Sequence, residues 1–530
     1  MKSFSCIILI FCLFCTSFSR QLPPDSKLLL KSRCLFFHLL LGQYSCFITI
    51  LVETDKQYAT NPMPSFDTVG DCYINYVYLV SHYLTYKKED LDKDEAIQDY
   101  FIVRNNYNDE GYLPFILSLL HSSTYTLIIK DGYFKNNYPD EAWITQAIQE
   151  LKKNQNKDIA TCHLEEIQDQ DVHLSIPKGC LFFQSLLLRS IITRTEFRRN
   201  SVDPFFFMAY AYRCKFQSNI ISVPINSYQD NNRLSSPKIS ISHYSNSDIT
   251  TNCEEAFQIQ DINCASHRPH NNTIGVLLSQ YKREYIYEQL EAIFHSSMSV
   301  SDIIVYQNGI YRSYQNVFKK YPTIHHIWST NWQSPYFLRM LLPLLFQTSY
   351  HIVFDDDIIP GPDTIKVLIN TVDKYEAPSG VGGRIVESSN YRYGSFNQIC
   401  VDCFNKKVTA VDFVIQVYAK TEIHSKVFWR YRPYTHRSCE DMHSSLSWYM
   451  ECKKRSYRAV FSGKSAYKNY GSDSVASWKT KSHNIVRPQT YRSWIMGGYH
   501  GIKDSTVRED YPRTLPKWES RHLSGVMRYF

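Results

Sequence analysis

Short apolar runs alternate with longer amphipathic segments between residues 273 and 500. The short runs are rich in β-branched and aromatic residues and read TIGVLLSQY, SDIIVYQNG and YHIVFDDD, a pattern that predicts strands. The longer segments place apolar residues three and four apart and read EYIYEQLEAIFHS, PYFLRMLLPLLFQ and GPDTIKVLINTVDKY. This alternation predicts an α/β fold, with a mostly parallel sheet and helices on both of its faces.

The three predicted strands end in polar residues, at Gln280, at Asn308 and at Asp355 to Asp357. In open α/β sheets, ligands bind in the crevice at the carboxyl ends of the strands. Three adjacent carboxylates repel one another, and Mg²⁺ or Mn²⁺ would relieve that repulsion while binding phosphate oxygens. The run therefore indicates a metal–phosphate site, and a solvated acidic turn is the alternative.

The first part of the chain repeats a pattern of the second. Residues 106–132 match residues 331–357 at a shift of 225 without a gap, in an Asn, a series of Leu, a Tyr and an Asp. Lys130 and Gly132 stand where the second copy has the first and third aspartates. A fixed positive charge there is poor for a divalent ion. We therefore expect two tandem copies of one fold, of which the first is degenerate.

The chain of 530 residues is too long for a single core. A polar stretch rich in Ser, Asn, Asp and Thr separates the two copies and reads as a linker. We expect a signal peptide or signal anchor at residues 1–22, followed by an apolar and linker segment at 23–67. A degenerate domain follows at 68–230, then the polar linker at 231–272. The working domain is expected at 273–500 and a C-terminal tail at 501–530.

The N-terminus, MKSFSCIILIFCLFC, places one Lys before an apolar run, which is the layout of a secretory signal. A second apolar stretch, residues 34–52, is either a membrane span or a buried helix. Of fifteen cysteines, ten follow this region, a number compatible with disulfides in an oxidising lumen. We expect a protein of the secretory pathway, in the ER or Golgi lumen, either anchored in the membrane or soluble.

The net charge of +7 is modest, and Lys and Arg are interspersed with acidic residues. Without a basic stripe and aromatic spacing, nucleic acid is not an expected partner.

Seven pieces of the second half stand in an order that resembles a known family. They are LLSQYKR ending at Arg283, VYQNG, Arg339, FDDD, YRYGSF, SCEDMHSSLSWYM, and Trp478 followed by His483 and Arg487. This half resembles nucleotide-sugar glycosyltransferases of the GT-A fold, in which the aspartates form a DxD motif, and most closely the exostosin-like transferase domains. The segments SPYFLR and VDFVIQVYAK depart from the family pattern.

The resemblance implies roles for individual residues. Asp357 and Asp355 would bind Mn²⁺ or Mg²⁺, and Asp441 and Arg487 would be catalytic. The nucleotide-sugar donor, a UDP-sugar by this resemblance, would contact Gln280, Arg283, Asn308, Arg339, Asp355, Asp356 and His483. The acceptor would be a glycan or a glycoprotein.

Simpler readings exist for several of these residues. Asn308 fits a QNG turn, His483 fits a basic surface stretch, and acidic residues at 440 and 441 fit a helix N-terminus. Two other functions stay open as well. One is a non-catalytic sugar-binding or scaffold protein, and the other is a metal-dependent nucleotidyl- or phosphotransferase, although no Gly-rich phosphate loop is present.

Overall fold

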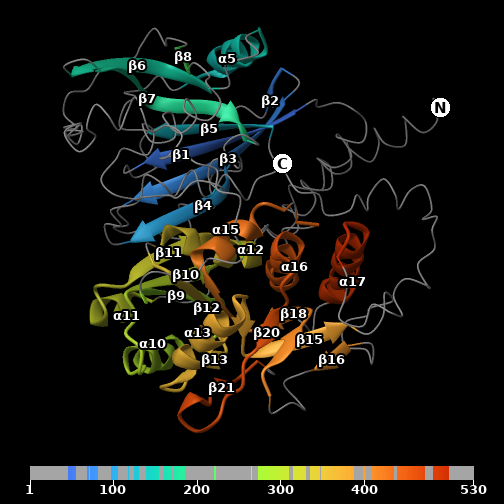
Figure 1. The fold of residues 1–530 in the computed structure, drawn as a ribbon. Coiled ribbons are helices and arrows are strands. Elements are labelled where there is room, and N and C mark those ends of the chain that lie inside the picture. Colours follow the sequence, from blue (N-terminus) through green and yellow to red (C-terminus); the bar gives the residue numbers. More distant parts are fainter. Residues whose placement is uncertain are drawn as a thin grey trace, which may run out of the picture.

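The computed structural model describes most of residues 272–499 and separate segments before them (Figure 1). The described residues are 46–54, 68–70, 72–81, 97–104, 117, 124–130, 139–153, 159–169, 172–185, 220–222, 264, 272–309, 314–329, 335–346, 348–386, 398–400, 407–431, 433–434, 438–471 and 481–499.

Strands and helices alternate in the second half, as its apolar pattern predicts. Its strands in the main sheet are β9 (Ile274–Gln280), β10 (Asp302–Asn308), β11 (His325–Ser329), β12 (Tyr350–Asp355), β14 (Ser379–Gly380), β17 (Thr409–Val411), β19 (Val417–Thr421) and β20 (Ser456–Arg458). Two small sheets contain β13 (Ile358–Ile359) with β21 (Lys468–Asn469), and β15 (Gly382–Val386) with β16 (Gln398–Cys400) and β18 (Phe413–Ile415).

The helices of this half include those that the apolar spacing predicts and several others. They are α10 (Ile286–Phe294), α11 (Gln315–Lys320), α12 (Pro335–Leu341), η6 (Leu342–Leu345), α13 (Thr364–Tyr375), α15 (Glu422–Phe428), α16 (Glu440–Cys452), η7 (Gly463–Ser465) and α17 (Lys481–Met496). One predicted helix divides into α12 and the 3₁₀ turn η6. Pro343 lies in that turn, and its ring and missing N–H disfavour a continued α-helix.

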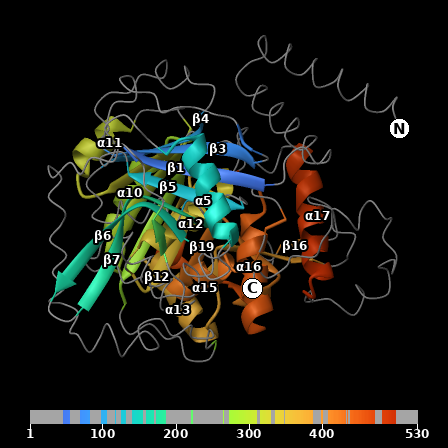
Figure 2. The same cartoon turned by 90° about the horizontal axis from the view of Figure 1, so that it is seen from above.

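Helices cover both faces of the second-half sheet, which confirms the predicted fold class (Figures 1 and 2). Alternate residues of β9 point to opposite faces. Val276 and Leu278 pack with apolar residues of α10, α11 and α13, whereas Leu277 packs with those of α12 and α15.

The first half contributes strands and one described helix to the same fold. The strands are β1 (Cys46–Thr54), β2 (Thr68–Val69), β3 (Cys72–Ser81), β4 (Ile97–Arg104), β5 (Tyr125–Lys130), β6 (Ile159–Asp169), β7 (Val172–Gln184) and β8 (Ile220–Ser222), and the helix is α5 (Glu141–Lys153). Trp143, Ile144, Ala147, Ile148 and Leu151 form the buried side of α5.

The position of β1 corrects an expectation about the second apolar stretch. Residues 46–52 form a strand between β3 and β5, not a membrane span or a buried helix. The first sheet therefore begins before residue 68, inside the segment expected to be a linker. A short apolar run does not distinguish a buried strand from a helix by periodicity, and the β-branched residues of CFITILVET favour the strand. Among the helices that the structure describes, none is long and apolar enough to cross a membrane.

The two halves repeat one strand order. In the first half it is β4-β3-β1-β5-β7, and in the second it is β11-β10-β9-β12-β19. In each half the first four strands pair in parallel and the fifth is antiparallel to the fourth. Tyr125 begins β5 and Tyr350 begins β12, as the shift of 225 requires. The structure thus supports the predicted tandem repeat.

Among the described residues the halves form one continuous 16-stranded sheet, because the edge strands β4 and β11 pair antiparallel. If Tyr125 and Tyr350 are taken as equivalent, the strand registers of the two halves make Ile102 of β4 the counterpart of Trp328 of β11. These two residues are also directly opposite each other in the β4–β11 pair. A pseudo-two-fold axis therefore passes between them, as in an isologous dimer interface within a single chain.

Lys130 ends β5 as Asp355 ends β12, so their backbones are equivalent. Asp131, Gly132 and the side chain of Lys130 lie outside the described residues. The degeneracy of the first copy stays a prediction.

Lys420 of β19 lies in the core of the second half, where it is 1% exposed. Its Nζ is 3.8 Å from Met340 Sδ and 5.6 Å from the centre of the Phe428 ring. No ion pair to Lys420 forms within the described parts of the chain. Burial lowers the pKa of Lys420 from 10.5 to about 7, because the charged amine loses its hydration.

We expect Lys420→Met to stabilise the protein at pH 6 by up to about 4 kcal/mol, with the gain shrinking toward pH 10. Between its folded and unfolded pKa values the lysine binds fewer protons in the folded state, so the stability of the unaltered chain rises with pH in that window. Urea unfolding at the two pH values measures the effect, with the exposed Lys366→Met as control. An equal stability change at both pH values would contradict the prediction.

Candidate functional site

The triple-aspartate turn connects β12 to β13, and a buried glutamine network holds it. Gln289 of α10 donates its Nε2 to the carbonyls of Asp355 and Ile358, at 2.7 and 2.8 Å. Its Oε1 accepts a 2.6 Å bond from Gln280 Nε2. Gln280 is 0% exposed, so its amide positions the turn through Gln289, whereas the resemblance implies a donor contact. Gln289 falls on the buried face of α10, between Ile286 and Leu290, but its helical spacing does not reveal the carbonyls to which it donates.

Two arginines compensate the first two aspartates. Arg339 of α12 pairs with Asp355, and Arg283, which follows β9, pairs with Asp356. The backbone N–H of Tyr281 also donates to Asp356, at 3.3 Å. Burial raises the pKa of Asp355 well above its usual range, and the Arg339 guanidinium counteracts that shift.

Asp357 lacks a comparably close cation. Its nearest one in the described part of the chain is Arg283, whose Nη1 is 3.7 Å from Asp357 Oδ2. Asp357 is only 8% exposed, and no described residue forms a hydrogen bond with its Oδ1. Burial raises the pKa of Asp357 to about 6, although Arg283 counteracts the shift. A buried carboxylate oxygen without a partner is costly, so this atom is suited to a bound cation.

A second pair of acidic residues begins α16, as the helix-start reading predicts. Asp441 accepts hydrogen bonds from both terminal nitrogens of Arg487 in α17, at 2.9 and 2.6 Å. Arg487 is 3% exposed, and its guanidinium also lies 5.1 Å from the centre of the Phe413 ring. A bidentate arginine favours an ionised carboxylate at Asp441. The resemblance directs Arg487 toward a diphosphate, but its terminal nitrogens face Asp441 in the structure.

Arg339 joins the two acidic groups into one site. Besides Asp355, its guanidinium pairs with Glu440, the residue before Asp441. The guanidinium also lies 5.4 Å from the centre of the Tyr418 ring. Burial between these charged groups raises the pKa of the Tyr418 phenol well above 10, so the phenol is neutral at physiological pH. The sequence did not predict Glu440 and Tyr418 as residues of this site, because the groups that they contact are distant along the chain.

Asn308 and His483 are the remaining predicted site residues. Asn308 ends β10, and Gly309 adopts a left-handed φ of 86° directly after it, which fits the turn reading of QNG. Asn308 Oδ1 is buried, and no described residue forms a hydrogen bond with it. His483 lies in α17, four residues before Arg487, and its side chain is outside the described residues.

The site can accept a divalent cation only with help from a substrate. No group of three or more His, Cys, Asp and Glu residues could hold a metal within the described segments. Mg²⁺ binds through one or two carboxylates, several waters and substrate phosphates instead of a closed protein cage. Asp357 fits that donor set, whereas Asp355 is already paired with Arg339.

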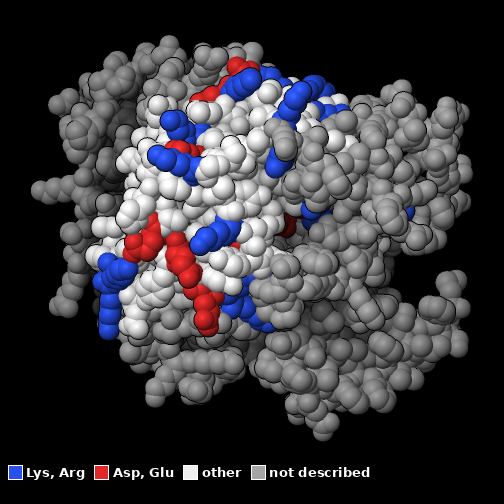
Figure 3. All heavy atoms as spheres, turned by 90° about the horizontal axis from the view of Figure 1, so that it is seen from below, with Lys and Arg blue, Asp and Glu red and all other residues white. Residues whose placement is uncertain are grey.

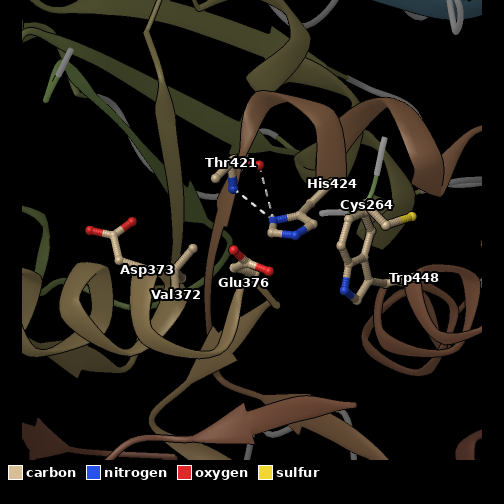
Figure 4. Close-up of a pocket in the computed structure, with 7 residues that line it drawn as sticks. All are labelled: Cys264, Val372, Asp373, Glu376, Thr421, His424 and Trp448. Atoms are coloured by element: carbon tan, nitrogen blue, oxygen red, sulfur yellow. Dashed lines mark hydrogen bonds between the residues drawn. The ribbon is translucent and has the colours of Figure 1, made fainter. Parts of the chain in front are cut away.

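A small pocket lies at the other end of β12 (Figure 4). It is lined by Cys264, Val372, Asp373, Glu376, Thr421, His424 and Trp448. Tyr350 pairs with Thr421 where β12 begins, and Asp355 is where it ends, roughly 17 Å away at the usual rise of a strand. The pocket is therefore separate from the aspartate site.

On the face seen from below, acidic and basic side chains are intermixed (Figure 3).

No family model and no curated protein sequence matches the chain. Solved structures similar to it include TarS of S. aureus, at 13% identity and a TM-score of 0.32, with 44% of this chain and 41% of TarS covered. TarS 1–349 with UDP-GlcNAc gives the same identity and TM-score and covers 44% and 69% of the two chains. TarS 1–349 with UDP gives 14% identity, a TM-score of 0.27 and coverages of 37% and 59%. A likeness at these TM-scores does not establish an activity for this chain.

Proposed function

We propose that this chain is a metal-dependent glycosyltransferase that transfers a sugar from a nucleotide-sugar donor, of the UDP class, to a glycan or glycoprotein acceptor. One observation carries the proposal. Of the three clustered aspartates, two have close arginine partners, whereas Asp357 is 3.7 Å from Arg283 and has a buried oxygen without a hydrogen-bond partner among the described residues. That arrangement fits a cation shared with phosphate oxygens.

Sugar transfer breaks the bond between the anomeric carbon and the diphosphate oxygen and forms one to an acceptor hydroxyl, which loses its proton. A bound Mn²⁺ or Mg²⁺ would stabilise the negative charge of the departing diphosphate. Asp357 would hold the ion, and Arg283, 3.7 Å from Asp357, would add positive charge beside the phosphates. Asp355 and Asp356, fixed by their arginines, would shape the donor pocket.

Asp441 would act on the other side of the reacting sugar. Its carboxylate is held by Arg487 and belongs to the same charged network as Asp355, through Glu440 and Arg339. An ionised, fixed carboxylate stabilises the positive charge that develops on the sugar ring in the transition state. Removal of the acceptor proton is the second role open to Asp441.

We further propose that the protein works in the secretory pathway, anchored in the membrane or soluble in the lumen. Disulfides Cys162–Cys180 and Cys264–Cys452 support an oxidising compartment, because disulfides are rare in reducing ones. The N-terminal apolar residues 1–45 lie outside the described residues.

A panel of UDP-sugars incubated with the full chain and Mn²⁺ tests the proposed activity, with release of UDP as the readout. We expect one or a few donors to be hydrolysed slowly, and faster with the right acceptor. Binding of UDP-sugar without turnover would instead indicate the scaffold alternative. Pyrophosphate release from nucleoside triphosphates would indicate a nucleotidyltransferase.

A further inference from the structure

The short strand β21 lies against the triple-aspartate turn. Ile358 of β13 pairs with Asn469, and the Tyr470 N–H donates to the Asp357 carbonyl at 2.9 Å. The Tyr470 ring stacks on Tyr285 at 4.4 Å between ring centres. These contacts fix the backbone of residues 468–471 beside Asp357, so the segment forms one wall of the site.

Gly471 packs directly against the Asp357 carboxylate. A Cβ on Gly471 would be 2.5 Å from Asp357 Oδ2, closer than real Cβ contacts, and 3.0 Å from Asn469 Oδ1, which is tight. The N–H of Gly471 donates to that same Asn469 oxygen at 2.8 Å, so the glycine is held where it is. The φ of Gly471 is not left-handed, and space beside the carboxylate is therefore what requires glycine.

We propose that Gly471 is a positioning residue for the cation-binding carboxylate: its missing side chain leaves the space that Asp357 Oδ2 occupies, and so holds the carboxylate with Oδ1 left for the ion. This inference rests on the proposed metal site and adds to it a residue that no motif indicates. Residues that orient a ligand typically affect metal affinity by 10- to 100-fold.

Manganese binding by the full chain in the presence of UDP, corrected by a titration of UDP alone, tests the functional part, because the substrate phosphates supply the remaining ligands. Electron paramagnetic resonance measures free Mn²⁺, and we expect Gly471→Ala to weaken binding by about 10- to 100-fold. Equal binding by Gly471→Ala and the unaltered chain would overturn the inference alone. Absence of binding by the unaltered chain would overturn the proposed metal site, and the inference with it.

A double-mutant cycle on thermal unfolding tests the contact without a metal. Gly471→Ala should lower the unfolding midpoint of the unaltered chain much more than that of an Asp357→Ala background, where the carboxylate no longer occupies the space and only the Asn469 contact remains. The double variant also covers the case in which Gly471→Ala alone does not fold, because the second substitution should restore folding. The same loss in both backgrounds would show that Gly471 supports β21 only, and would overturn the proposal.

Discussion

Replacing Arg339 by Met is expected to destabilise the fold by about 3–5 kcal/mol. Arg339 is buried and is the shared cation of two carboxylates, Asp355 and Glu440. Methionine would fill much of the volume but leave both acids uncompensated in the interior. Two neighbouring carboxylates without a cation then either take up a proton or become exposed through local unfolding. Denaturant unfolding at neutral pH measures the loss.

The matched control removes the carboxylates together with the cation. A triple variant with Arg339→Met, Asp355→Asn and Glu440→Gln should recover most of the stability, because no buried charge then lacks a partner. If Arg339→Met alone costs less than about 1 kcal/mol, the value for an exposed ion pair, the network is not buried as described.

Replacing Asp441 by Asn is expected to lower turnover by at least about 100-fold, if the carboxylate acts on the reacting sugar or the acceptor proton. Binding of UDP should persist, since the donor phosphates are assigned to the aspartate turn. Asn retains the shape of the side chain but leaves the buried Arg487 without its anion, so stability falls as well. Turnover alone does not separate these effects.

A second variant separates them. The double substitution Asp441→Asn with Arg487→Gln removes both charges and keeps polar groups that can bond to each other. It should regain stability without regaining turnover. Recovery of turnover in this double variant would show that the pair is structural and that Asp441 has no part in the reaction.

Local patterns in the sequence predicted much of the architecture around the site. The runs before Gln280, Asn308 and Asp355 are strands of one sheet, and three predicted helical segments contain α10, α12 and α13. These features follow from apolar spacing within a few residues, which is the range over which periodicity is informative. The repeated strand order likewise follows from the pattern shared at a shift of 225.

The partners of the charged residues could not be predicted in this way. Arg339 and Glu440 are 101 residues apart, and Asp441 and Arg487 are 46 apart, so their pairing depends on how α12, α16 and α17 pack. The hydrogen bond between Gln280 and Gln289 could not be predicted either, because it depends on how α10 packs on the sheet. The pairing of β4 with β11 depends on the arrangement of the two halves.

The claim that Asp357 holds a cation for the donor phosphates is tested most directly by calorimetric titration of UDP with and without Mn²⁺. The unaltered chain should bind UDP much more tightly with Mn²⁺, and Asp357→Asn should lose that dependence. Asp363→Asn is the matched control, since Asp363 is six residues away and its side chain forms no capping hydrogen bond. Mn²⁺-dependent UDP binding of equal strength in Asp357→Asn and the unaltered chain would contradict the claim.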